Sequence, residues 1–330
     1  MNATSVSAVF TPERCSKGES DMSRSTSQAI PGLHHVTAIS GPPQTNLDFW
    51  IGTLGQRLVK RTVNFDDPGT YHLYYGDDDA APGSIMTFFP FVGAGPGRAG
   101  AGMASAVAYT VSDLDQRMID LAEAAIDFEG PFERIGERAI ALKDPDGLRV
   151  EMTEGGARDE GFHSVTLWLD EVEPTARVLE AMGYVREAED ATATGGTGGT
   201  ETRVRYRSTD PGRGSAVDLM TSDARSIGRS GAGTIHHVAF RARTAEEQQE
   251  WRKRLSEIGL DVTPVIDRQY FDAIYFRTPS GVLFEIATDP PGFAVDEDAA
   301  HLGETLKLPE KFEAHRARIE QVLPEIRVPS

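Results

Sequence analysis

Two adjacent histidine pairs and one late glutamate are the residues best suited to metal chemistry. His35 is the second histidine of GLHHVTAIS, and His237 is the second histidine of TIHHVAFRA. Glu285 lies in the apolar run GVLFEIATD. Two imidazoles and one carboxylate on one face of a metal leave positions open for O2 and a substrate, which non-haem iron(II) oxygenases require. This donor set suits iron(II) or manganese(II), and its lack of thiols argues against a structural zinc site.

Four copies of one sequence pattern must position these residues. Each copy opens with a strand-like segment, continues with a helix pattern and ends with two or three strand-like runs. The openings start at Gly32, Met103, Gly161 and Thr234, and the last runs start at Gly83, Gly147, Gly214 and Gly281. A single βαβββ module leaves one sheet face uncovered, and two modules that curl around each other would bury it. We therefore predict an α+β fold in which four βαβββ modules form two open β-barrels.

Equivalent positions of the four modules differ in their chemistry. The second opening position and the middle of the last strand hold, in module order, His35, Ala106, Ser164 and His237, and then Thr87, Glu151, Asp218 and Glu285. If modules one and four share a barrel, His35, His237 and Glu285 converge inside it. The other barrel lacks these histidines, so we expect one catalytic metal per chain. Arg149 would lie on the strand face of Glu151 and could pair with it.

The second histidine of each pair is the better candidate ligand. Adjacent residues of a regular strand point to opposite faces of the sheet, so His34 and His35 cannot both bind a metal from such a strand. Module three keeps a first histidine, His163, but has Ser164 at the second position. Packing alone could explain one strand histidine, whereas two pairs at equivalent positions favour a metal site.

At these residues the chain resembles the vicinal oxygen chelate superfamily, which contains glyoxalases, bleomycin-resistance proteins and extradiol dioxygenases. It looks most like the branch of para-hydroquinone ring-cleaving dioxygenases. The resemblance covers about residues 31–310 and is carried by GLHHVTAISGPPQTNLDFW, DPGTYHLYYGD, GTIHHVAFR, DRQYFDAIYFR, GVLFEIATDPPGF and AHLGETLKLPE.

The resemblance implies specific roles for several side chains. The ligands of Fe(II) would be His35, His237 and Glu285. Arg268 and Tyr275 would line the substrate pocket, where arginine suits a phenolate and tyrosine can exchange a proton. Three further residues fall near the site in this branch: His34, Thr37 and His236. His72, in YHLYYGD, is expected to be structural or to lie behind the site.

The implied activity is an Fe(II)-dependent, extradiol-type opening of a hydroquinone-like aromatic ring by O2, with substituted, chlorinated and catechol substrates left open. The alternative is a metal-dependent glyoxalase-type isomerase or lyase on the same fold. Such enzymes usually need a fuller set of carboxylates, whereas Thr87 stands at the fourth equivalent position. A non-catalytic module of the bleomycin-resistance type ranks third, because that class generally lacks the ligand set.

Charge, hydropathy and cysteine content restrict the classes of binding partner and the cell compartment that we expect. The chain has 330 residues and a formal net charge of −18, which disfavours nucleic acid and anionic membranes. It has no apolar run of the ~20 residues that a membrane span needs, and its first residues do not resemble a secretory signal. Cys15 is the single cysteine. We expect a cytoplasmic protein whose partners are a small aromatic substrate and O2, and the sequence leaves a homo-oligomer open.

The domain boundaries follow from the modules. We expect a disordered N-terminal tail over residues 1–29, an N-terminal pair of modules over 30–156 and a C-terminal pair over 157–292. Residues 293–330 would form a C-terminal extension with a helix, because PEKFEAHRARIEQVLPE has a helical pattern.

Overall fold

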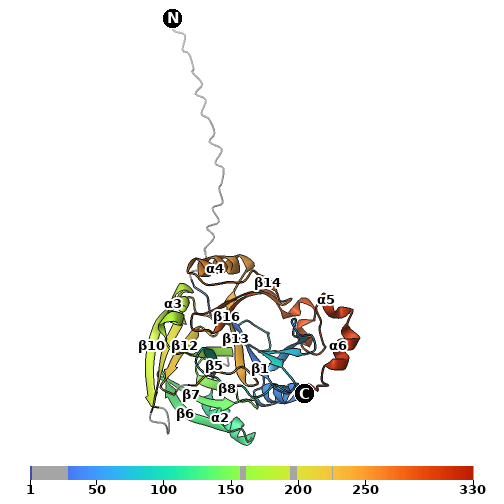
Figure 1. Cartoon of the computed structure of the whole chain (residues 1–330), viewed down its shortest axis with the longest axis horizontal. Coiled ribbons are helices and arrows are strands. Elements are labelled where there is room, and N and C mark those ends of the chain that lie inside the picture. The colour runs from blue at the N-terminus through green and yellow to red at the C-terminus, as the bar shows by residue number, and fades with distance from the viewer. Residues whose placement is uncertain (2–28, 157–160, 194–198, 225, 330) are drawn as a thin grey trace.

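The computed structural model describes residues 1, 29–156, 161–193, 199–224 and 226–329. Apart from Met1 and Ala29, the predicted N-terminal tail lies outside these described residues. The two eight-stranded sheets lie next to each other, with helices around them and the C-terminal helices at one side (Figure 1).

The first sheet is built from modules one and four. Its strand order is β14 (Ile266–Asp267), β15 (Phe271–Arg277), β16 (Leu283–Pro291), β13 (Thr234–Ala242), β1 (Leu33–Ser40), β4 (Ile85–Pro90), β3 (Tyr71–Gly76) and β2 (Arg57–Val63). The central strands β1 and β13 are antiparallel, and each has the last strand of its own module parallel beside it. The modules that carry the two histidine pairs therefore meet in one sheet.

The second sheet is built in the same way from modules two and three. Its order is β10 (Tyr184–Ala193), β11 (Thr200–Ser208), β12 (Ala216–Ser222), β9 (Gly161–Trp168), β5 (Met103–Val111), β8 (Arg149–Glu154), β7 (Glu137–Lys143) and β6 (Phe128–Arg134). The predicted α+β fold with paired βαβββ modules is confirmed. Each sheet takes one module from residues 30–156 and one from residues 157–292.

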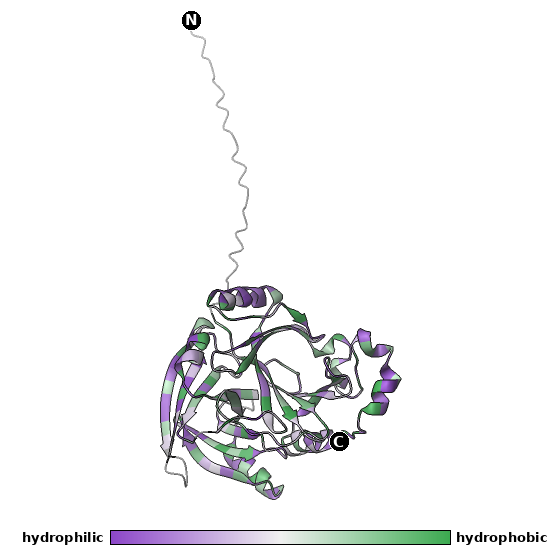
Figure 2. Ribbon diagram, viewed as in Figure 1, coloured by the Kyte–Doolittle hydropathy of each residue, from purple (hydrophilic) through white to green (hydrophobic). Residues whose placement is uncertain are grey.

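One helix of each module follows its opening strand. These helices are α1 (Pro43–Leu47), which continues as a π-helix over Asp48–Thr53, α2 (Leu114–Glu123), α3 (Glu173–Ala181) and α4 (Ala245–Glu257). The Thr244 hydroxyl caps α4 by accepting a hydrogen bond from the amide of Glu247, at 3.2 Å. α4 is largely hydrophilic (Figure 2), but two of its own side chains, Trp251 and Leu255, are buried. Its outer face is solvated while its inner face covers the sheet.

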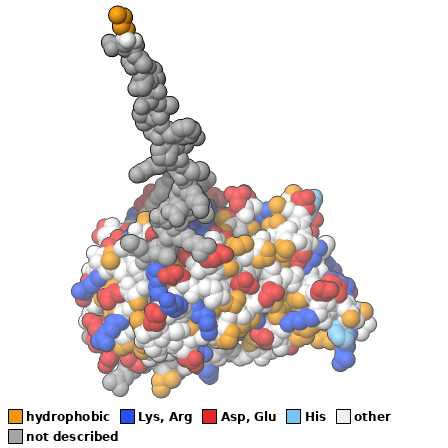
Figure 3. Space-filling view, turned by 90° about the horizontal axis from the view of Figure 1, so that it is seen from above, with side chains coloured by type: hydrophobic (Ala, Val, Ile, Leu, Met, Phe, Trp, Pro, Cys, Tyr) orange, Lys and Arg blue, Asp and Glu red, His pale blue; other side chains and the backbone are white. Residues whose placement is uncertain are grey.

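The C-terminal extension packs beside the first sheet. It contains short 3-10 helices at Phe293–Val295 and Ala299–His301, followed by α5 (Glu310–Glu313) and α6 (Arg316–Val322). The single helix predicted here is thus interrupted between α5 and α6. No helix in the described part of the chain has both the length and the apolar character of a membrane span. Acidic and basic side chains are interspersed over the face seen in Figure 3.

Two buried clusters show where the site can form. The larger hydrophobic cluster runs through both sheets and includes Trp50, Val107 and Phe284. The smaller one belongs to the first sheet and includes Tyr74 and Phe271, with Tyr275 packed against it. The buried polar residues of the same sheet include His35, His237 and Glu285, which the alignment of the modules singles out.

Candidate metal centre

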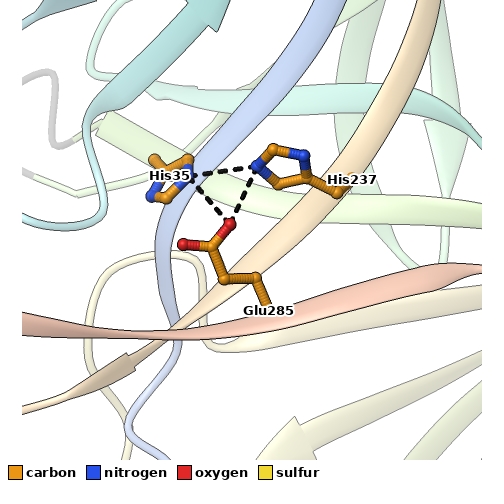
Figure 4. Close-up of side chains that lie close together, drawn as sticks. All are labelled: His35, His237 and Glu285. Carbon is orange, nitrogen blue, oxygen red and sulfur yellow. Dashed lines mark hydrogen bonds and ion pairs between the residues drawn. The ribbon is translucent and has the colours of Figure 1, made fainter. Parts of the chain in front are cut away.

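Three strands of the first sheet bring the predicted ligands together. His35 on β1, His237 on β13 and Glu285 on β16 point toward one another (Figure 4). Their side chains are buried, with Glu285 fully so. His237 Nε2 lies 3.0 Å from Glu285 Oε2, His35 Nε2 lies 3.6 Å from the same oxygen, and the two Nε2 atoms are 3.3 Å apart. Among the described residues, this is the group of histidine, cysteine and acidic side chains that could hold a metal ion.

The spacing and chemistry of this group fit a divalent cation. Two ligand atoms that each lie about 2.1 Å from one ion are about 3.0 Å apart at a right angle and about 3.6 Å apart near 120°. The observed separations span this range. Neither carboxylate oxygen of Glu285 has a hydrogen-bond partner among the described residues. A buried carboxylate is costly without a positive charge beside it, and a cation between the three ligands would supply that charge.

The protonation states also favour metal binding. Burial alone would raise the pKa of Glu285, but the neighbouring imidazoles of His35 and His237 hold it well below its usual value. Burial lowers the pKa of His237. The low pKa of Glu285 keeps its carboxylate ionised, and the low pKa of His237 makes its proton easy to displace, so a cation can replace the imidazole protons beside the carboxylate.

A β-bulge lies at each histidine pair. In the β1–β13 ladder, two residues of β1 oppose one step of β13 at His34, and the reverse holds at His236. The bulges place the two side chains of each pair side by side, with an Nδ1–Nδ1 distance of 2.9 Å for His34 and His35 and 2.8 Å for His236 and His237. Strict alternation of side chains is therefore wrong at these positions, because bulges re-aim them.

The first histidine of each pair can orient the second. Burial lowers the pKa of His34 to about 3 and that of His236 to about 4, so both are neutral at physiological pH. A neutral Nδ1 can accept a hydrogen bond from the Nδ1–H of the next histidine. This leaves Nε2 of His35 and of His237 without a proton and free to bind a metal. Hydrogen-bond partners of metal-binding histidines commonly fix the tautomer in this way.

A cavity of about 290 Å³ opens beside the three ligands. Its aromatic walls come from Phe65, Phe89, Phe91 and Phe271. This volume is at the lower end of the range for small-molecule pockets. The cavity thus has the size and the apolar walls for a single aromatic ring.

Arg268 and Tyr275 both line this cavity. Arg268 donates a hydrogen bond from Nε to the Tyr275 hydroxyl at 3.1 Å, and its guanidinium lies 5.3 Å from the centre of the Tyr275 ring. It also pairs with the exposed Asp66 at 3.3 Å. Burial and the Glu285 charge keep the pKa of Tyr275 well above its usual value, so its phenol stays protonated. A cation and a proton donor are therefore available next to the ligand group.

Sequence reasoning placed Thr37 near the site but did not find its partners. The Thr37 hydroxyl is 2.8 Å from that of Thr87, and Thr87 Oγ1 is 2.9 Å from His72 Nε2. His72 and Tyr74 line the cavity. Tyr74 was missed because its place beside Thr87 on β3, which repeats that of Tyr275 beside Glu285 on β15, appears only in the register of the strands.

Arginines occupy the equivalent region of the second barrel. Arg149 Nε donates to Glu151 at 2.9 Å, as predicted, and Arg134 contacts the same carboxylate. Arg205 binds both oxygens of Asp218, at 2.7 and 2.9 Å. Although burial would raise it, these surroundings lower the pKa of Glu151 to about 2. Both carboxylates are thus neutralised by guanidinium groups.

Comparisons with known proteins agree with this geometry. The family model described as "Glyoxalase/Bleomycin resistance protein/Dioxygenase superfamily" matches residues 32–152 and 197–286. The Bacillus subtilis (strain 168) protein named "Putative ring-cleaving dioxygenase MhqO" is 44% identical over 312 residues, covering 88% of this chain and 95% of the relative. The "Chlorohydroquinone/hydroquinone 1,2-dioxygenase" of Sphingobium indicum is 32% identical over 312 residues, covering 87% of this chain and 94% of the relative.

Solved structures share the fold. The crystal structure of a "putative dioxygenase" from Bacillus subtilis subsp. subtilis str. 168 matches with a TM-score of 0.84 and 41% identity, covering 92% of this chain and all of that one. Glyoxalase I from Zea mays matches with a TM-score of 0.58 and 13% identity, covering 78% of this chain and 92% of that one. The relatives and the buried ligand group identify the chain as an enzyme of the oxidoreductase class. The chain belongs to the glyoxalase, bleomycin resistance protein and dioxygenase superfamily.

Proposed function

We propose that the chain is an Fe(II)-dependent ring-cleaving dioxygenase that opens a hydroquinone-like dihydroxy aromatic, substituted or chlorinated forms included, with O2. The observation that carries the proposal is the buried group of His35, His237 and Glu285 beside a cavity with aromatic walls. The relatives named as ring-cleaving and hydroquinone dioxygenases support the same reaction class.

In this proposal His35, His237 and Glu285 hold the ion. When bound, the ion supplies the redox chemistry and the positions at which a substrate oxygen and O2 bind. Arg268 offers positive charge to a phenolate or to a developing oxyanion. Tyr275 holds a proton that it can donate to an oxygen of the ring or of the product. Manganese(II) fits the same donor set.

The first histidine of each pair has a supporting role. His34 and His236 accept hydrogen bonds from the ligand histidines and so fix the orientation and tautomer of both rings. Thr37 lies two residues after His35, and its hydroxyl bonds with that of Thr87. Because Thr87 is not an acid, the group has three protein ligands, which favours a dioxygenase over the isomerase or lyase alternative.

The experiment is to load the protein with Fe(II) or Mn(II) without oxygen and then measure O2 uptake with hydroquinone, chlorohydroquinone and catechol. One O2 should be consumed for each ring opened, and labelled O2 should place both atoms in the open-chain product. Release of hydrogen peroxide with the ring intact would indicate an oxidase. Isomerisation of a hemithioacetal without O2 uptake would indicate the glyoxalase-type alternative.

A further inference from the structure

The strand β3 gives the cavity a second polar wall. The ligand strands β16, β13 and β1 lie in the middle of the first sheet, with β15 on one side and β4 and β3 on the other. Arg268 and Tyr275 belong to the β15 side. His72 and Tyr74 belong to the β3 side, and both line the same cavity.

The two sides are related by the internal repeat. Tyr275 on β15 is in register with Glu285, and Tyr74 on β3 is in register with Thr87. Thr87 is the counterpart of Glu285 in module one. Thr87 pairs with the residue two positions after His35 in β1, and Glu285 pairs with the residue two positions after His237 in β13. Tyr74 is therefore the counterpart of Tyr275. Two tyrosines at equivalent places, Tyr74 and Tyr275, therefore line the cavity.

A chain of hydrogen bonds supports the Tyr74 hydroxyl. It lies 2.8 Å from His72 Nδ1, and His72 Nε2 lies 2.9 Å from Thr87 Oγ1, which lies 2.8 Å from Thr37 Oγ1. All four side chains are buried. Both ring nitrogens of His72 are engaged, so its ring is held between a phenol and a hydroxyl. Because each member can donate or accept, the chain can run in either direction, and the Tyr74 oxygen can accept a hydrogen bond from the cavity or donate one to it.

We propose that Tyr74 binds the second hydroxyl of a 1,4-dihydroxybenzene, with His72 and Thr87 as positioning residues. This inference rests on the proposed function. In a para-diol the two oxygens lie at opposite ends of the ring, so when one is at the ligand group the other lies away from it, among the other side chains that line the cavity. A hydroxyl buried there needs a partner, because an unpaired polar group is costly. In a catechol both oxygens lie at the same end of the ring, so no second hydroxyl would be placed for Tyr74 to bind.

The test compares hydroquinone with phenol, which lacks the second hydroxyl. Dissociation constants are measured by calorimetry on Fe(II)-loaded protein without oxygen, so that binding is separated from turnover. In Tyr74→Phe the constant for hydroquinone should rise about five- to tenfold, the usual cost of one hydrogen bond. The constant for phenol should change less than about twofold, because phenol makes no such bond. Thr87→Val should act in the same direction by a smaller factor.

Tyr75→Phe is the matched control. Tyr75 is the next residue, is fully buried and donates its hydroxyl hydrogen bond to Asn46 at 2.8 Å, away from the cavity. This variant should bind both compounds as the wild type does. Equal loss of affinity for hydroquinone and phenol in Tyr74→Phe, or no loss for either, overturns the inference about Tyr74. If the wild type still oxidises hydroquinone in that case, the proposed function stands. A wild type that neither binds nor oxidises any dihydroxybenzene overturns both.

Discussion

Glu151 should stabilise the second barrel without taking part in metal binding, and Glu151→Gln tests both claims. The carboxylate is buried between arginines, which lower its pKa to about 2, against an ordinary value near 4.5. At 1.36 kcal/mol per pKa unit, this shift corresponds to about 3 kcal/mol of unfolding free energy at pH 7. Since the glutamine cannot carry the charge, most of this stabilisation should be lost in the variant.

The pH dependence gives the prediction its sign. A carboxylate whose pKa is lowered in the folded state stabilises the protein above its unfolded pKa, and the effect is lost as the pH falls toward the folded pKa. The difference in unfolding free energy between wild type and variant should therefore fall from about 3 kcal/mol at pH 7 to about 1 kcal/mol at pH 3. Urea unfolding followed by fluorescence, at several pH values, measures this difference.

Glu154→Gln is the control for this experiment. Glu154 lies on the same strand but is exposed, and it forms an ion pair with Arg138 at 3.6 Å. Its replacement should change stability by less than about 1 kcal/mol, as is usual for surface ion pairs. A loss below about 1 kcal/mol for Glu151→Gln at pH 7, or a loss that does not shrink in acid, would refute the reasoning. Loss of iron from this variant would show that the second barrel holds part of the metal site.

Three further predictions concern the metal centre. Replacing His35, His237 or Glu285 by Ala should abolish activity and bound iron while circular dichroism remains native, and normal iron content in any variant would remove that residue from the set. Arg268→Ala and Tyr275→Phe should lower turnover or substrate affinity without loss of iron, and iron loss in either, seen by metal analysis, would contradict these roles. Reconstituted protein should contain one iron per chain, and removing it with a chelator should lower the melting temperature, because a ligand that binds the folded state stabilises it. Two tightly bound irons, or an unchanged melting temperature, would count against a single built site.

The repeat made much of this molecule predictable. The positions of His35, His237 and Glu285 could be read from the module alignment, and the ion pair between Arg149 and Glu151 followed from strand alternation. These inferences depend on periodicity, which the sequence displays directly.

Other features depend on how distant strands meet. The bulges at His34 and His236 leave no local signal, because they result from a slip between β1 and β13, about 200 residues apart in the chain. His72 was expected to lie behind the site, and its presence on the cavity wall follows from the curl of the sheet that brings β3 round to the ligands. Curl and register slips arise from packing between modules, and a single module's pattern does not encode them.

The pairing of the modules has a consequence for how the protein acquires its metal. Modules two and three are neighbours in the chain, so their sheet closes over short sequence separations, which favours fast folding. The first sheet must join β1 near the start to β13 and β16 near the end, a contact of high sequence separation that costs more chain entropy. During synthesis, His35 emerges long before Glu285, and the complete ligand group cannot exist until module four has emerged. An unfinished chain therefore lacks the three-residue group, and all three ligands can hold a metal ion together only after module four has folded against module one.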